Sequence, residues 1–239
     1  MKNKFIESVK RRARATISAV KAVAAKWIWQ EQSADQMEAE LEAIIGNNNT
    51  TPPIVGQEEI ASKAQAAAHN AESNWKAQIK DLHQRTVQGL NMAKTKFRNE
   101  PVSYGVVSSL HADGTTTEEI LSQALAWESA WGQIAATWNP SATNTFADYK
   151  TLRKQCAEES QIALKDAASA ASEETGKLEQ MASNLNDVII AWYADATRMF
   201  PAGTPEGDMI RSTIPTTYTA SSHKAQPAPT PTPPAGKTS

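Results

Sequence analysis

Residues 57–98 read QEEIASKAQAAAHNAESNWKAQIKDLHQRTVQGLNMAKTKFR. Apolar side chains recur in this stretch every three or four residues, from Ile60 to Phe97, and no proline interrupts them. Side chains with this spacing share one face of an α-helix. We therefore expect one long helix over residues 57–98. It ends before Pro101, because proline cannot donate the backbone hydrogen bond that continues a helix.

The same spacing predicts one continuous helix upstream, over residues 3–45. Gly46 stops it, because glycine readily adopts the left-handed conformation found at helix ends. A loop follows over residues 48–56, which contains two prolines. Two helices of similar length with a short connection predict an antiparallel helical hairpin.

Downstream, residues 99–114 are expected to form a packed loop, although Val102–Leu110 is rich in β-prone residues. Thr116 and Glu119 have the spacing of a capping box, which predicts the start of a shorter helix that ends near Trp138.

The last helix is expected to run from residues 141–144 to Phe200. Its predicted inward positions include Cys156, Ala163, Ala167 and Ala170. Gly176 is the expected bend, because glycine costs ~1 kcal/mol relative to alanine inside a helix.

Residues 201–218 are rich in turn formers, and Thr204-Pro205-Glu206-Gly207 predicts a turn or a helix start. Met209, Ile210 and Ile214 are expected to pack on the bundle. Residues 219–239 consist mostly of Pro, Thr, Ala and Ser, a composition that predicts a disordered tail. The tail could act as a spacer or present a polyproline helix to an aromatic groove.

The predicted fold is therefore all-α: an elongated antiparallel bundle of long amphipathic helices, with a helical hairpin, a shorter helix and a long helix. The bundle domain covers residues 1–218. Apolar residues make up 40% of the chain, and many are alanine, so we expect a thin core. Trp127, Trp131 and Trp138 share a predicted helix face and are assigned to that core. Trp27 and Trp29 cannot share a helix face, so at least one of them should be exposed or at a contact.

This sequence contains no signature of a metal site, a phosphate-binding loop or a disulfide framework. None of the histidines has a glutamate three residues before it, and no zinc or EF-hand pattern occurs. The terminal Gly-Lys-Thr-Ser lacks the earlier glycine, the strand and the helix of a phosphate-binding loop. The lone Cys156 excludes an intrachain disulfide and is assigned to the core. We therefore expect no enzyme activity, no metal or cofactor and no small-molecule ligand.

No signal peptide or transmembrane segment is evident, so a cytoplasmic location is the default expectation. The net charge of −2 argues against nucleic-acid binding. Residues 1–29 nevertheless carry eight basic side chains against one acidic one. A basic amphipathic helix with tryptophan near its charge boundary is typical of helices that bind anionic membrane surfaces. The candidate contacts are Lys2, Lys4, Lys10, Arg11, Arg12, Arg14, Lys21, Lys26 and Trp29.

The alternative for this segment is that its basic face is solvated or pairs with acidic patches elsewhere, such as Glu158, Glu159, Glu173 and Glu174. The long helices and the missing site chemistry favour a non-enzymatic helical scaffold or protein-interaction module that binds a protein partner or self-associates. A peripheral binder of anionic membranes through residues 1–29 is the alternative. A third reading, an enzyme or ligand carrier, requires a cavity among Trp75, Trp127, Trp131 and Trp192.

Overall fold

The computed structural model describes residues 2–135 and 137–214, with side chains described from residue 4 onward. These residues divide into two compact units. We call residues 1–39 and 184–239 the terminal unit, and residues 40–183 the central unit. The predicted disordered tail, residues 219–239, lies outside the described residues.

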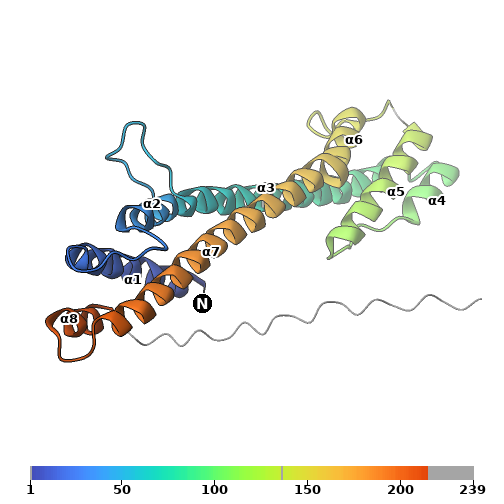
Figure 1. Ribbon diagram of the computed structural model, residues 1–239. Helices are drawn as coiled ribbons and strands as arrows, with labels where there is room; N and C mark the ends of the chain where they lie inside the picture. The colour runs from blue at the N-terminus through green and yellow to red at the C-terminus, as the bar shows by residue number, and fades with distance from the viewer. Residues whose placement is uncertain (1, 136, 215–239) are drawn as a thin grey trace, which may run out of the picture. The chain divides into compact units, whose positions relative to one another are not determined.

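Every regular element of the described chain is helical, which confirms the all-α class (Figure 1). In chain order the elements are α1 (Lys2–Val23), α2 (Ala34–Ile45), α3 (Gln57–Lys96), α4 (Pro101–Ser108), α5 (Thr117–Ala135), α6 (Phe146–Lys154), a π-helical turn η1 (Gln155–Glu159), α7 (Ser160–Met199) and α8 (Pro205–Thr213). The division between the two units falls within α2 and α7.

The prediction of one continuous helix over residues 3–45 is wrong, because α1 ends at Val23. Its carbonyl oxygen accepts two backbone N–H groups, from Lys26 at 2.8 Å and from Trp27 at 3.0 Å, and the chain then leaves the helix. The next helix, α2, begins only at Ala34.

The tryptophans of the terminal unit explain this break. The Trp27 ring packs against Trp192 at 6.4 Å and against Phe200 at 6.0 Å between ring centroids. Two residues later, the Trp29 indole N–H donates to Asp195 Oδ2 at 3.1 Å. Side chains two residues apart point to different sides of a helix. Both indoles therefore reach α7 only because residues 24–33 are not helical.

The start of α8 agrees with the turn predicted at Thr204. The Thr204 hydroxyl accepts the backbone N–H of Gly207 at 3.1 Å, which caps the first turn of the helix. Ile210 and Ile214 are buried in the terminal unit, as expected, and Met209 is partly buried.

In the central unit, Gly46 ends α2 with a φ of +84°, which confirms the predicted stop. Asn47 and Ile54 exchange two backbone hydrogen bonds that close the loop before α3. A Cβ atom on Gly56 would lie 2.3 Å from the Gly46 nitrogen, so the end of α2 abuts the start of α3.

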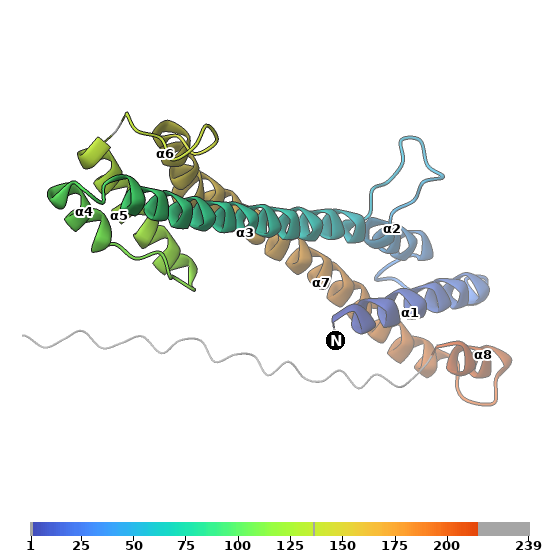
Figure 2. The same cartoon turned by 180° about the vertical axis from the view of Figure 1, so that it is seen from behind.

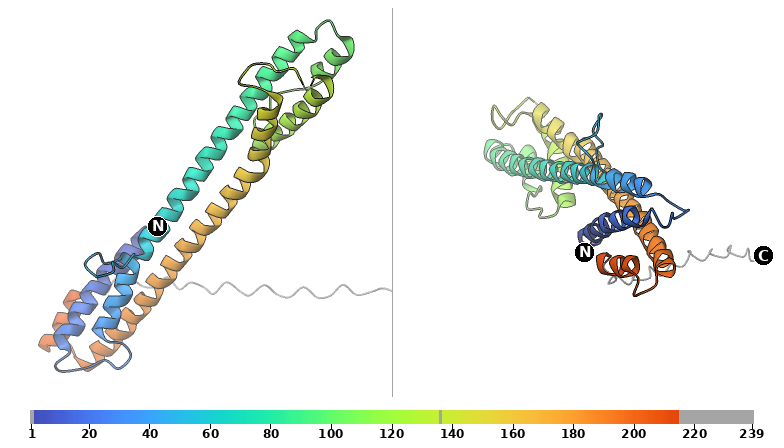
Figure 3. Two further views of the ribbon diagram at one scale, coloured as in Figure 1. Left: turned by 90° about the horizontal axis from the view of Figure 1, so that it is seen from above. Right: turned by 60° about the vertical axis from the view of Figure 1, so that its left-hand side comes forward.

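The antiparallel partner of α3 is α7, and not the helix predicted upstream. Gln57 near the start of α3 donates to Glu174 Oε2 at 2.6 Å, whereas Gln78, further along α3, accepts from the Ser160 hydroxyl at 2.6 Å. The residue numbers rise along one helix as they fall along the other. Within the central unit, α7 thus runs beside α3 in the opposite direction (Figure 3).

An aromatic core lies at the end of α3 where α4, α5 and α6 gather (Figures 1 and 2). Trp127 and Trp131 are buried and stack with ring centroids 5.2 Å apart. Trp138 is partly buried and packs edge-on against Phe97 at 5.4 Å. The assignment of these three tryptophans to the core is confirmed.

The packed loop predicted over residues 99–114 is wrong in part, because it contains α4. Pro101 occupies the first turn of this helix, where its missing N–H costs nothing. The predicted capping box is confirmed: the backbone N–H of Glu119 donates to Thr116 Oγ1 at 3.3 Å, and the backbone N–H of Thr116 donates to Glu119 Oε2 at 3.0 Å.

The last predicted helix is helical throughout but contains the π-helical turn η1, and α7 continues through Gly176 without a break. A π-helical turn holds one more residue than an α-helical turn, which changes the inward register where it occurs. Ala167, as predicted, is partly buried, and Leu178 is buried. Ala163 and Ala170 were predicted to face inward and are exposed, whereas Leu164 and Ala171 are partly buried instead.

Two glycines test how tightly the central unit is packed. A Cβ atom on Gly89 of α3 would lie 2.8 Å from Nε1 of the buried Trp127, whereas one on Gly176 of α7 would meet nothing within 4 Å. We expect Gly89→Ala to destabilise the protein by ~1–3 kcal/mol, because the ring must move. Gly176→Ala should stabilise it by up to ~1 kcal/mol through helix propensity. Urea unfolding of both variants measures these changes, and a stabilised Gly89→Ala variant would contradict the packing.

Candidate interaction surfaces

Four of the eight basic side chains proposed as anionic-surface contacts have partners within the terminal unit. Lys10 pairs with Glu7 at 2.6 Å, and Lys21 pairs with Glu38 at 2.6 Å. Lys26 pairs with Glu206 of α8. Arg12 Nη1 donates to Asn186 Oδ1 at 2.7 Å. These four cations therefore help to hold the unit together.

The remaining candidates are distributed differently. Lys4, Arg11 and Arg14 are exposed on α1, and the side chain of Lys2 lies outside the described residues. Trp29 is buried, and the exposed apolar residue beside it is Ile28, which is 72% exposed. Binding of an anionic surface stays a prediction, with Lys4, Arg11 and Arg14 as its accessible cations. Because α1 supplies buried residues, point substitutions test it better than removal of residues 1–29.

The four acidic residues considered as partners for the basic segment lie in the central unit. Lys177 pairs with Glu173 and with Glu174, each at 2.8 Å, and these contacts lower the pKa of Glu174. Glu158 and Glu159 are exposed.

Arg12 is a cation without a carboxylate partner in the described chain. It is 8% exposed, burial lowers its pKa, and its Nε atom has no hydrogen-bond partner among the described residues. The hydrogen bond to Asn186 therefore offsets part of the free energy that it costs to remove the Arg12 guanidinium from water.

This arrangement predicts a strong coupling between the two side chains. Asn186→Ala should destabilise the protein by ~2 kcal/mol, because a hydrogen bond to a buried charge is lost. In an Arg12→Met background the same substitution should cost much less, since no buried charge remains. Urea unfolding of the single and double variants measures the coupling. An equal cost in both backgrounds would show that the bond to Arg12 is not what Asn186 contributes.

The middle of the α3/α7 pair has no core of its own. No residue of 62–78 or of 157–177 is buried. The large apolar side chains in these two ranges are Trp75, Ile162 and Leu164, and most other inward positions are alanine. We call these two ranges the central segment. Polar contacts hold it together, among them the bond from Gln65 Nε2 to Thr175 Oγ1 at 3.0 Å.

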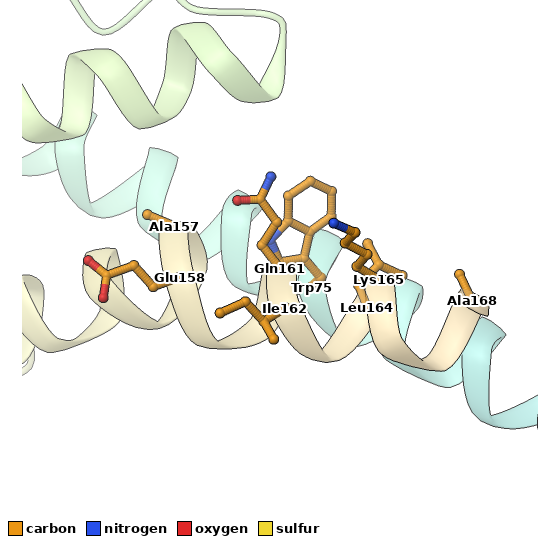
Figure 4. Close-up of a pocket in the computed structure, with 8 residues that line it drawn as sticks. All are labelled: Trp75, Ala157, Glu158, Gln161, Ile162, Leu164, Lys165 and Ala168. Carbon is orange, nitrogen blue, oxygen red and sulfur yellow. The ribbon is translucent and has the colours of Figure 1, made fainter. Parts of the chain in front are cut away.

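A groove of about 600 Å³ lies on this segment, with Trp75 of α3 behind it and two turns of α7 along it (Figure 4). Its lining residues are Trp75, Ala157, Glu158, Gln161, Ile162, Leu164, Lys165 and Ala168. Ile162 is 60% exposed. Glu158 of η1 lies toward one end of the row of side chains, and Lys165 and Ala168 of α7 lie toward the other, with Gln161 and Ile162 between Glu158 and Lys165.

The π-helical turn positions Trp75 at the groove. Such a turn disturbs the helical hydrogen-bond ladder and frees carbonyl groups for other donors. The indole N–H of Trp75 donates to the Cys156 carbonyl oxygen at 3.0 Å, which fixes the ring between α3 and the turn. Sequence reasoning missed the groove, because nothing in residues 155–159 signals the extra residue. Trp75 was the available signal, as a lone large side chain in an alanine-rich stretch.

The lining of the groove contains one carboxylate, Glu158, and no histidine or cysteine. No group of three or more His, Cys, Asp or Glu side chains in the described residues could hold a metal ion. Of the tryptophans named for the ligand-carrier reading, Trp75 lines the groove, whereas Trp127 and Trp131 are packed in the aromatic core and Trp192 belongs to the terminal unit. Among the described helices, none is both long and apolar enough to cross a membrane.

Cys156, whose carbonyl oxygen accepts the Trp75 indole N–H, belongs to the aromatic core and is fully buried. Burial raises the pKa of its thiol to about 11. The thiolate is the reactive form, and at pH 8 it would make up about one part in a thousand. We therefore expect a thiol reagent to leave the native protein essentially unlabelled at pH 8 and to label it rapidly in denaturant. Labelling followed by mass spectrometry tests this, and rapid labelling of the native protein would contradict the burial.

Comparison with known proteins provides no relative for this chain: no family model, no curated protein and no solved structure matches it. Function is therefore inferred from the physical features of these surfaces.

Proposed function

We propose that the chain is a non-enzymatic helical scaffold whose central segment binds another protein. The observation that carries the proposal is the absence of any buried residue over residues 62–78 and 157–177, in two paired helices that are each 40 residues long. In globular proteins most helix stability comes from packing of an apolar face. In this long helix pair, Ile162 is exposed and Leu164 and Trp75 are only partly buried. Binding of a partner would complete the packing of these side chains.

The composition of the groove supports a protein partner over a small molecule. Ligand pockets are concave and bring a few polar groups together at one point. Here the lining side chains follow η1 and the first two turns of α7, and the two charged ones are seven residues apart. A surface of this kind fits an amphipathic helix laid along it, with anchors at every third or fourth residue. Burial of Ile162 alone would contribute ~2 kcal/mol.

Site-directed photo-crosslinking tests this function. Ile162→Cys carries a benzophenone at the groove. Ala170→Cys carries it at an exposed position of α7, nine residues or two and a half turns beyond Gln161 and therefore on the opposite side of the helix from Gln161. The buried Cys156 should stay unlabelled. With the full-length chain in an extract of its native cells, including unlabelled chain, we expect several-fold more protein adducts from position 162 than from position 170. Equal adduct yields at the two positions would contradict a binding role for the groove.

A further inference from the structure

We propose that the partner in the groove is a second copy of this chain, bound with its α7 antiparallel about a two-fold axis near Gln161 and Ile162. This inference rests on the proposed function, because it names the protein that covers the central segment. The pattern of charges along the groove supports a second copy, because this pattern is complementary to itself when the helix is reversed.

The geometry of the charges defines the axis. Glu158 of η1 and Lys165 of α7 both line the groove and are seven residues apart, which is about two turns or ~10 Å along the helix axis. In a two-fold interface, residue i of one copy contacts residue j of the other, and j contacts i. Reversal of α7 about the midpoint of this pair places Glu158 of each copy opposite Lys165 of the other. The apolar Ile162 lies next to the axis, where the interface is most desolvated.

The availability of these two charges supports the pairing. Neither Glu158 nor Lys165 has an ion-pair or hydrogen-bond partner in the described part of the chain. Some other charges on α3 and α7 are paired within the chain, as in Lys76 with Glu72 at 2.6 Å. A parallel arrangement of two copies would place like charges opposite each other at both ends of the groove, which is unfavourable.

The rest of the groove suits a copy of itself. Its apolar floor consists of Trp75, Leu164 and small side chains of α7, so a second α7 can approach closely and cover Ile162. Two alanine-rich helix pairs that face each other would form a four-helix arrangement in which each pair supplies the cover that the other lacks. An unrelated partner would need its own matching order of one anion, one apolar anchor and one cation.

Charge reversal in the full-length chain tests the orientation by sedimentation equilibrium. We expect the wild type to dimerise and each of Glu158→Lys and Lys165→Glu to raise the dimer dissociation constant about tenfold, because each creates two like-charge contacts. The double variant, Glu158→Lys with Lys165→Glu, should restore dimerisation, since the charge order is again complementary. Two single variants without effect, or a double variant as weak as the singles, would overturn the antiparallel pairing.

A cysteine cross-link provides a second readout that does not depend on charge. Gln161→Cys lies beside the proposed axis and should form a disulfide-linked dimer under mild oxidation, whereas Ala170→Cys on the other side of α7 should not. A wild type that stays monomeric at all concentrations and forms no such cross-link would overturn the second copy as partner. If position 162 still gives adducts with other proteins in that case, the proposed scaffold function stands and only this inference fails. If it gives none, both fail.

Discussion

The structure depends on one constraint, the small supply of large apolar side chains on the long helices α3 and α7. Alanine extends a helix at little entropic cost but buries little surface. In the central unit an aromatic core forms at one end of α3, where Trp127, Trp131 and Tyr149 pack with Leu82 and Cys156. Along the central segment, residues 62–78 and 157–177, side-chain hydrogen bonds join the two helices, and each contributes only ~0.5–1.5 kcal/mol. A surface of partly covered apolar groups follows from this distribution.

The π-helical turn at residues 155–159 joins the aromatic core to the alanine-rich central segment. The turn rotates α7 relative to α6, so that Tyr149 and Cys156 face the aromatic core while Ser160 and Leu164 face α3. Trp75 completes the junction by donating to the Cys156 carbonyl, and its ring forms the floor of the groove. The same irregularity that joins the core to the alanine-rich pair thus leaves Ile162 exposed on the outside.

Sequence periodicity predicted the all-α class, the extent of α3, the stop at Gly46, the cap at Thr116 and the burial of the tryptophan stripe, because each depends on local chemistry. Its errors have tertiary causes. The break after Val23 reflects two indoles that both pack against α7, and no local helix breaker marks it. After the π-helical turn the inward positions are Ser160, Leu164, Ala167 and Ala171, so Ala163 and Ala170 are exposed. Of the predicted site residues, Arg12 and Trp29 were chosen for charge and amphipathicity, but both are buried by contacts with residues more than 150 positions away in the chain.

The functional account follows from the central segment: an alanine-rich helix pair that is held by polar contacts and completed by a second α7. Hydrogen exchange at increasing protein concentration tests this claim most directly. The account predicts that backbone amides of residues 71–78 and 157–168 exchange more slowly as concentration rises, while amides of α5 around Trp127 do not change. Exchange rates for residues 157–168 that are the same at every concentration, or that slow equally across the whole chain, would contradict it.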